Sequence, residues 1–227
     1  MPIIEAKGVR KVYRGDGVAT EALRGVDLVV EAGEFAALVG PSGSGKSTLL
    51  HLLAGLDLPT EGEVWVGGVP LSRLSRGERA RFRLERVGLV FQAYNLLPVL
   101  TALENAAFVL ELRGLPRSER ERRAREALAA LGLEDKVGRF PRQLSGGEQQ
   151  RVAVARALAA EPLIVLADEP TANLDSQNGL ALIERMKALN EEKGVTFLFS
   201  THDPRLLEHV KRIVRLEDGR IVGEERR

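Results

Sequence analysis

Short apolar runs alternate with segments of helical periodicity along most of the 227-residue chain. This alternation is typical of an α/β protein whose sheet is mainly parallel. The predicted strands cover 3–13, 26–30, 35–39, 63–66, 86–91, 163–167 and 195–200. The predicted helices cover 47–54 and 176–193, and the chain closes with a hairpin that turns at Asp218 and Gly219.

Residues 93–161 interrupt the alternation with a run of helical patterns alone. Capping boxes, in which a hydroxyl and a carboxylate satisfy each other's backbone amides, predict three helix starts in this part of the chain. They are the Ser/Thr-x-x-Glu runs Thr101–Glu104, Ser118–Glu121 and Ser145–Glu148. We therefore expect a helical insert, 93–161, within a core formed by 1–92 and 162–227.

Composition limits the classes of function. Hydrophobic residues make up 44% and charged residues 29%, which predicts a folded protein with a real core. The net charge of +1 argues against a protein that coats nucleic acid, and the absence of cysteine excludes disulfides and thiolate chemistry. No apolar run approaches the roughly 18 residues of a membrane span, so we expect a cytoplasmic chain whose membrane role requires a separate partner.

A glycine-rich run at the end of the 35–39 strand matches the phosphate-loop pattern without a gap. Its glycines let successive amides face phosphate oxygens, Lys46 adds a full charge near the β- and γ-phosphates, and the Ser47 hydroxyl is suited to ligate Mg²⁺. The predicted ATP-binding residues here are Gly40, Pro41, Ser42, Gly43, Ser44, Gly45, Lys46, Ser47 and Thr48. The motif predicts a nucleoside triphosphate and magnesium, and it leaves a kinase, a GTPase and a motor ATPase open.

Asp168 and Glu169 follow a second apolar strand, at the sheet edge where α/β proteins bind ligands. We expect Asp168 to hold Mg²⁺, directly or through a water ligand. Glu169 is suited to act as general base for the water that attacks the γ-phosphate.

The run Leu-Ser-Gly-Gly-Glu-Gln-Gln-Arg at 144–151 resembles the signature motif of ATP-binding cassette (ABC) ATPases, and it precedes Asp168 as in that family. The resemblance extends over nearly the whole chain. It implies a single nucleotide-binding domain, 1–227, with a RecA-like P-loop NTPase core, an N-terminal antiparallel β-subdomain and an inserted α-helical subdomain.

The resemblance also implies roles for single residues. Gln92 resembles the Q-loop glutamine that senses Mg²⁺, Asp175 belongs to a D-loop, His202 resembles the switch histidine, and Tyr13 resembles the aromatic residue that stacks on adenine. Members of this family pair head to tail, so each ATP would contact Lys46 and Ser47 of one chain and the signature of the other. The signature residues are Ser145, Gly146, Gly147 and Glu148.

The same resemblance implies a catalytic set of Lys46, Glu169 and His202, and a homodimer that drives an integral membrane permease. The apolar segment 94–100 is a candidate dock for that permease, although plain core packing would also explain it. The protein would then be peripheral on the inner face of the cell membrane. We expect no nucleic-acid partner.

A narrower likeness, to the ATPases of lipoprotein-releasing systems, macrolide exporters and the cell-division pair, rests on segments 14–22, 95–105 and 167–176. Ala172 departs from the glycine expected there. Two alternatives stay open: a cassette ATPase that acts on DNA, and a phosphate-loop kinase that acts on a small molecule. The first normally carries a long coiled coil, and the second leaves 145–148 and His202 unexplained.

Overall fold

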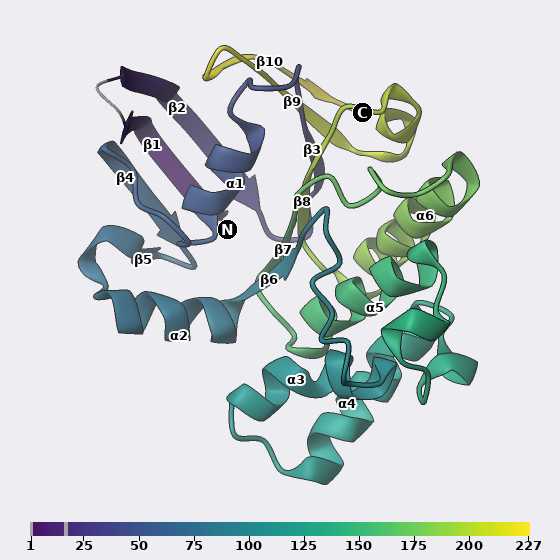
Figure 1. Ribbon diagram of the computed structural model, residues 1–227. Helices are drawn as coiled ribbons and strands as arrows, with labels where there is room; N and C mark the ends of the chain where they lie inside the picture. Colours follow the sequence, from purple (N-terminus) through teal and green to yellow (C-terminus); the bar gives the residue numbers. More distant parts are fainter. Residues whose placement is uncertain (1, 16–17) are drawn as a thin grey trace.

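The computed structural model describes residues 2–15 and 18–227, in which strands and helices alternate as Figure 1 shows. The strands are β1 (Pro2–Gly15), β2 (Val18–Glu31), β3 (Phe35–Val39), β4 (Glu61–Val66), β5 (Val69–Pro70), β6 (Val87–Val90), β7 (Ile164–Ala167), β8 (Phe197–Thr201), β9 (Arg212–Glu217) and β10 (Arg220–Arg226). The α-helices are α1 (Lys46–Leu53), α2 (Arg76–Arg86), α3 (Ala102–Leu112), α4 (Arg117–Ala130), α5 (Gly146–Ala159) and α6 (Ser176–Lys193). Short 3-10 turns are η1 (Leu71–Arg73), η2 (Glu134–Lys136), η3 (Pro141–Gln143) and η4 (Pro204–His209).

The strands form two sheets. Six strands in the order β10-β9-β3-β8-β7-β6 make the central sheet, which is parallel except for the antiparallel β9–β10 pair. The order β2-β1-β4-β5 makes a four-stranded antiparallel sheet from the N-terminal part of the chain. The predicted fold class, an α/β phosphate-loop core with an N-terminal antiparallel sheet and inserted helices, is confirmed.

The alternating side chains of β3 explain how the central sheet joins two apolar cores. Phe35, Ala37 and Val39 pack into the core shared with α3–α6, whereas Ala36 and Leu38 pack into the core shared with α1 and the antiparallel sheet. Every residue of β3 is buried, as expected of a parallel strand covered on both faces. The end of β3 is therefore rigid, and the phosphate loop begins there.

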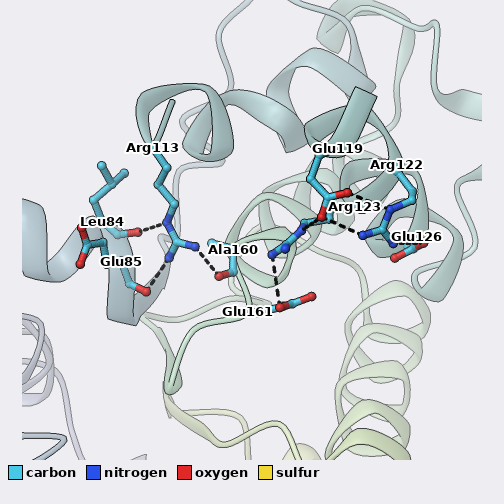
Figure 2. Close-up of polar contacts among 9 residues, drawn as sticks. All are labelled: Leu84, Glu85, Arg113, Glu119, Arg122, Arg123, Glu126, Ala160 and Glu161. Atoms are coloured by element: carbon cyan, nitrogen blue, oxygen red, sulfur yellow. Dashed lines mark hydrogen bonds and ion pairs between the residues drawn. The ribbon is translucent and has the colours of Figure 1, made fainter. Parts of the chain in front are cut away.

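The helices α3, α4 and α5 lie below the sheet in Figure 1, and one arginine ties the end of α3 to the ends of α2 and α5. Arg113, which follows α3, donates to the carbonyls of Leu84 (3.0 Å), Glu85 (2.5 Å) and Ala160 (2.7 Å), as Figure 2 shows. Leu84 and Glu85 lie in the last turn of α2, and Ala160 caps α5. One guanidinium thus satisfies carbonyls at the ends of two helices that lack partners within the helix.

Two helix starts differ from the sequence prediction. The capping boxes at Thr101 and Ser145 form, but the predicted one at Ser118 does not. Helix α4 begins two residues earlier, with Pro116 rather than Ser118 at its N-cap, and Glu121 pairs with Arg117 at 2.7 Å instead. Helix α2 was not predicted, and it begins at a further capping box, Ser75–Glu78.

Strand β2 is also longer than predicted. It runs over Val18–Glu31 rather than 26–30, and it pairs with β1 along nearly its whole length.

Candidate functional site

The phosphate loop spans the gap between the buried end of β3 and the start of α1. Gly45 precedes α1 with φ +105°, a conformation that an L side chain rarely adopts. A Cβ on Gly40 would lie 2.0 Å from the carbonyl oxygen of Leu216, and one on Gly45 would lie 2.6 Å from that of Ala22. Neighbouring backbone therefore requires glycine at both positions.

Lys46, the first residue of α1, is nearly buried, and its ammonium folds back over the loop. Nζ donates to the carbonyl of Gly40 at 2.8 Å and to that of Pro41 at 3.0 Å. A cation held by carbonyls alone carries a full positive charge into the loop, where it would attract an anion.

Asp168, which follows β7, is linked to two neighbouring elements through one oxygen. Its Oδ1 accepts from Ser47 Oγ at 3.1 Å and from Ser200 Oγ at 2.7 Å. The predicted pairing of the phosphate loop with the carboxylate after β7 is therefore present in the structure. Ser200, at the end of β8, was not predicted as a site residue.

Glu169 has φ +46°, an uncommon backbone conformation for a residue with a side chain. Its amide donates to Ser200 Oγ at 2.8 Å, and its Oε2 lies 2.9 Å from Nδ1 of His202. Ser200 thus holds both members of the Asp168–Glu169 pair. Strain of this kind is found at functional sites, where surrounding contacts maintain it.

Lys46, Ser47, Glu169 and His202 line a cleft of about 510 Å³. Gln92 and Ala172 line it as well, and Asn173 Nδ2 donates to the carbonyl of Gln92 at 2.9 Å. Its lining residues are Ala22, Ser42, Gly43, Gly45, Lys46, Ser47, Thr48, Gln92, Glu169, Ala172 and His202. The structure therefore brings the predicted catalytic residues and most of the phosphate loop to one place.

The signature residues lie apart from this cleft. Ser145 and Glu148 cap α5 reciprocally, at 2.7 and 3.2 Å, and the hydroxyl of Tyr94 lies 2.8 Å from the position of a Cβ on Gly146. Asp175 caps α6 by accepting from the amide of Asn178 at 2.9 Å. One chain does not bring its own signature to its own phosphate loop.

Tyr13 stands on β1 opposite Thr20, two residues before Ala22 of the cleft lining, and it is 42% exposed. Tyr13 is not among the residues that line the cleft, so its stacking on adenine stays a prediction from the resemblance.

The oxygen donors around Asp168 fit a hard divalent cation. Ser47 and Asp168, which contact each other, supply a hydroxyl and a carboxylate, and Gln92 supplies an amide to the cleft that Ser47 also lines. Across residues 2–15 and 18–227, no three His, Asp or Glu side chains form a metal cluster. Such a site suits Mg²⁺, which usually takes one or two carboxylates together with phosphate oxygens and water.

In the part of the chain that the structure describes, none of the helices has the length and apolar character to cross a bilayer.

Comparison with known proteins agrees with this geometry. Residues 23–172 match the family model described as ABC transporter. The chain is 48% identical over 220 residues to an uncharacterized ABC transporter ATP-binding protein of Methanocaldococcus jannaschii, covering 97% of this chain and 98% of that protein. It is 49% identical over 224 residues to the lipoprotein-releasing system ATP-binding protein LolD of Anaeromyxobacter dehalogenans, covering 98% and 94%.

Among solved structures, an ATP-binding cassette captured as a dimer in a post-hydrolysis state with ADP and Pi resembles this chain with a TM-score of 0.90. The two are 43% identical, and the match covers 98% of each chain. This chain therefore belongs to the ABC transporter family, in which it is an ATP-binding subunit that hydrolyses ATP.

Proposed function

We propose that two copies of this chain close around two ATP molecules and drive a separate membrane permease. The separation of the signature from the cleft carries the proposal. Lys46, Ser47, Glu169 and His202 meet in one cleft, whereas Ser145–Gly147 lie elsewhere, so a second copy must supply the signature. That the similar cassette was solved as a dimer with ADP and Pi supports this arrangement.

Each residue of the cleft has a chemical task in this proposal. Lys46 and the loop amides hold the β- and γ-phosphates, and Tyr13 stacks on the base. Ser47, Gln92 and Asp168 hold Mg²⁺, which neutralises phosphate charge when bound. Glu169 accepts a proton from the attacking water, and His202, 2.9 Å from it, orients that carboxylate toward the γ-phosphate.

The second copy acts through the capped start of α5. Ser145, Gly146 and Gly147 present a helix N-terminus, which attracts phosphate because its free amides and dipole are positive. Hydrolysis removes the γ-phosphate between the two copies, so the dimer loosens. We also propose one nucleotide-binding domain over 1–227, with 93–161 as its helical subdomain.

A groove of about 390 Å³ between α2, β6, α3 and α5 supports docking of the permease. Buried Asn105 bonds the backbone of Leu97 and Leu100, at 2.8 to 3.1 Å, and so fixes the segment predicted as a dock. Val99 within that segment is 78% exposed. An apolar helix of the permease would dock on the groove and on the neighbouring segment 94–100. The chain would then lie on the inner face of the membrane.

We further propose a permease that exports, releases lipoprotein or transmits motion. The relative named as the ATP-binding protein of a lipoprotein-releasing system supports the second of these roles.

The dimer is tested by the dependence of activity on protein concentration. A composite site predicts that ATP hydrolysis per chain rises with concentration until dimers saturate. Constant specific activity in a sample shown to be monomeric would overturn the composite site.

The dock is tested by co-purification with the membrane protein encoded by a reading frame next to this chain's gene, where that frame encodes one. Val99→Glu is expected to abolish capture and leave ATP hydrolysis intact. Val222→Glu, at an exposed valine on β10, is the matched control and should retain capture. Retention on DNA in place of a membrane protein would contradict the proposal.

A further inference from the structure

The ring of Tyr13 is in contact with a half-buried cation. Lys11 lies on the same strand, and its Nζ sits over the ring of Tyr13, 5.0 Å from the centroid. A cation over an aromatic face is attracted by the ring electrons. A base that stacks on Tyr13 must therefore approach the face that points away from Lys11.

Lys11 itself has little freedom to move. Its side chain is 12% exposed, and Nζ lies 2.7 Å from Oδ2 of Asp57 and donates to the carbonyl of Leu58 at 2.8 Å. The hydroxyl of Tyr13 also donates to Oδ2 of Asp57, at 3.4 Å. One carboxylate thus holds both the cation beside the ring and the tip of the ring.

The carboxyl of Asp57 is held in its ionised form by its neighbours. Burial alone would raise the pKa of Asp57, yet hydrogen bonds from Lys11 and from the amide of Leu58 lower it below its ordinary value. Lys11 and Asp57, 2.7 Å apart, therefore form an ion pair that contacts both the face and the hydroxyl of Tyr13.

We propose that Lys11, held by Asp57, is a positioning residue that fixes the ring of Tyr13 for stacking on the base of ATP. This inference rests on the proposed function, in which Tyr13 receives the base. Lys11 acts through the tyrosine alone and touches no phosphate, so it contributes to base affinity and not to hydrolysis.

The same strand offers a matched control. Lys7 lies over the ring of Trp65, with Nζ 4.7 Å from the centroid, and pairs with Glu5 at 2.9 Å. This contact repeats the chemistry of Lys11 on Trp65 of β4, an aromatic residue with no part in the proposed base site. Lys7→Met should therefore leave nucleotide binding unchanged.

The experiment compares two probes, ATP and inorganic tripolyphosphate, by equilibrium binding to the full chain. Tripolyphosphate has no base, so it reports the phosphate loop alone. Stacking on an aromatic side chain contributes roughly 5- to 100-fold in affinity, and this is the loss expected for Tyr13→Ala with ATP. Lys11→Met is expected to weaken ATP binding by about 3- to 10-fold. The affinity for tripolyphosphate and kcat should stay within twofold of the wild type.

A double variant separates positioning from a purely structural tie. If Lys11 acts through the ring, Lys11→Met adds no further loss in the Tyr13→Ala background. Lys11→Arg keeps a cation in place and should recover part of the ATP affinity. Asp57→Asn should weaken ATP in the same direction as Lys11→Met.

The inference would be overturned if Lys11→Met weakened ATP and tripolyphosphate binding equally. It would also be overturned if Lys11→Met cost as much ATP affinity in the Tyr13→Ala background as in the wild type. Tripolyphosphate binding by each variant also shows that its phosphate loop is folded. Unchanged ATP affinity in Tyr13→Ala alone would instead contradict the base site of the proposed function, so the two failures are distinguishable.

Discussion

Nδ1 of His202 lies 2.9 Å from Oε2 of Glu169. The two residues follow β8 and β7, which are neighbours in the parallel sheet, so the carboxyl ends of both strands bring them to one edge. The carboxylate can only accept, so the contact requires a proton on Nδ1. Together with the Ser200 hydrogen bond to the backbone of Glu169, it holds the proposed general base from two sides.

The variant Glu169→Gln should bind ATP and hydrolyse it about 10²- to 10⁴-fold more slowly, the usual contribution of a general base. The amide keeps the shape of the side chain and cannot take a proton from water. ATP should therefore trap a dimer, visible as an earlier elution in gel filtration alongside a phosphate-release assay.

Glu161→Gln is its matched control, because Glu161 also has a left-handed backbone, with φ +48°, and does not line the cleft. It should hydrolyse ATP at the wild-type rate. Normal turnover in Glu169→Gln would assign the base to another group.

Lys46→Ala should weaken ATP binding itself, by roughly 10- to 100-fold, because a charge-assisted contact to phosphate is lost. Isothermal titration with ATP measures this effect. Unchanged ATP affinity would mean that the phosphate loop does not bind ATP. The thermal midpoint shows whether the carbonyls of Gly40 and Pro41, which accept from Lys46, tolerate the loss.

Arg113→Met should lower the free energy of unfolding by about 2–4 kcal/mol, since three carbonyls lose a charged donor. Urea denaturation followed by circular dichroism measures the change. Burial lowers the pKa of Arg113, as expected of a guanidinium that donates its hydrogen bonds to carbonyls inside the protein.

Arg122→Met is the surface control, because Arg122 is exposed and pairs with half-buried Glu119 and exposed Glu126 (Figure 2). Its midpoint should stay at the wild-type value. Equal midpoints for both variants would mean that Arg113 contributes no more than a surface arginine.

The capping box of α5 should make the free energy of unfolding depend on pH in the acidic range. The amide of Ser145 donates to Glu148 and, against a smaller opposing effect of burial, lowers the pKa of that carboxyl. A lowered pKa stabilises the folded state above the ordinary value of about 4.3, and the benefit is lost as the pH falls through the folded value.

Glu148→Gln retains an acceptor that does not titrate. The stability difference between wild type and this variant should therefore shrink from pH 6 to pH 3 in urea unfolding. A difference that is constant with pH would show that the ionised carboxylate does not contribute.

Local patterns predicted much of this molecule. The phosphate loop, the strands β3, β7 and β8 and the helix starts at Thr101 and Ser145 each depend on a few consecutive residues, so the sequence alone was sufficient. Successive side chains of β3 pack into two different cores because side chains of a strand point to opposite faces in turn.

The features that the sequence did not predict have physical causes. Helix α2 buries none of its side chains, so no apolar stripe marks it, and only the Ser75–Glu78 box was available as a signal. The same Ser-x-x-Glu pattern failed at Ser118 because Pro116 already occupies the N-cap. Ser200 contacts Asp168 and Glu169 only through the pairing of β7 with β8, which no local pattern contains.

The helices α3, α4 and α5 share one apolar core with Phe197 and Phe199 of β8. During synthesis, however, a ribosome releases all three helices before either phenylalanine. Until β8 emerges, the apolar faces of the helices have no complete sheet to pack against, and contacts this distant in sequence form slowly. The nascent chain therefore passes through a stage in which it exposes the surface that the finished protein buries, and at this stage it is most prone to aggregate.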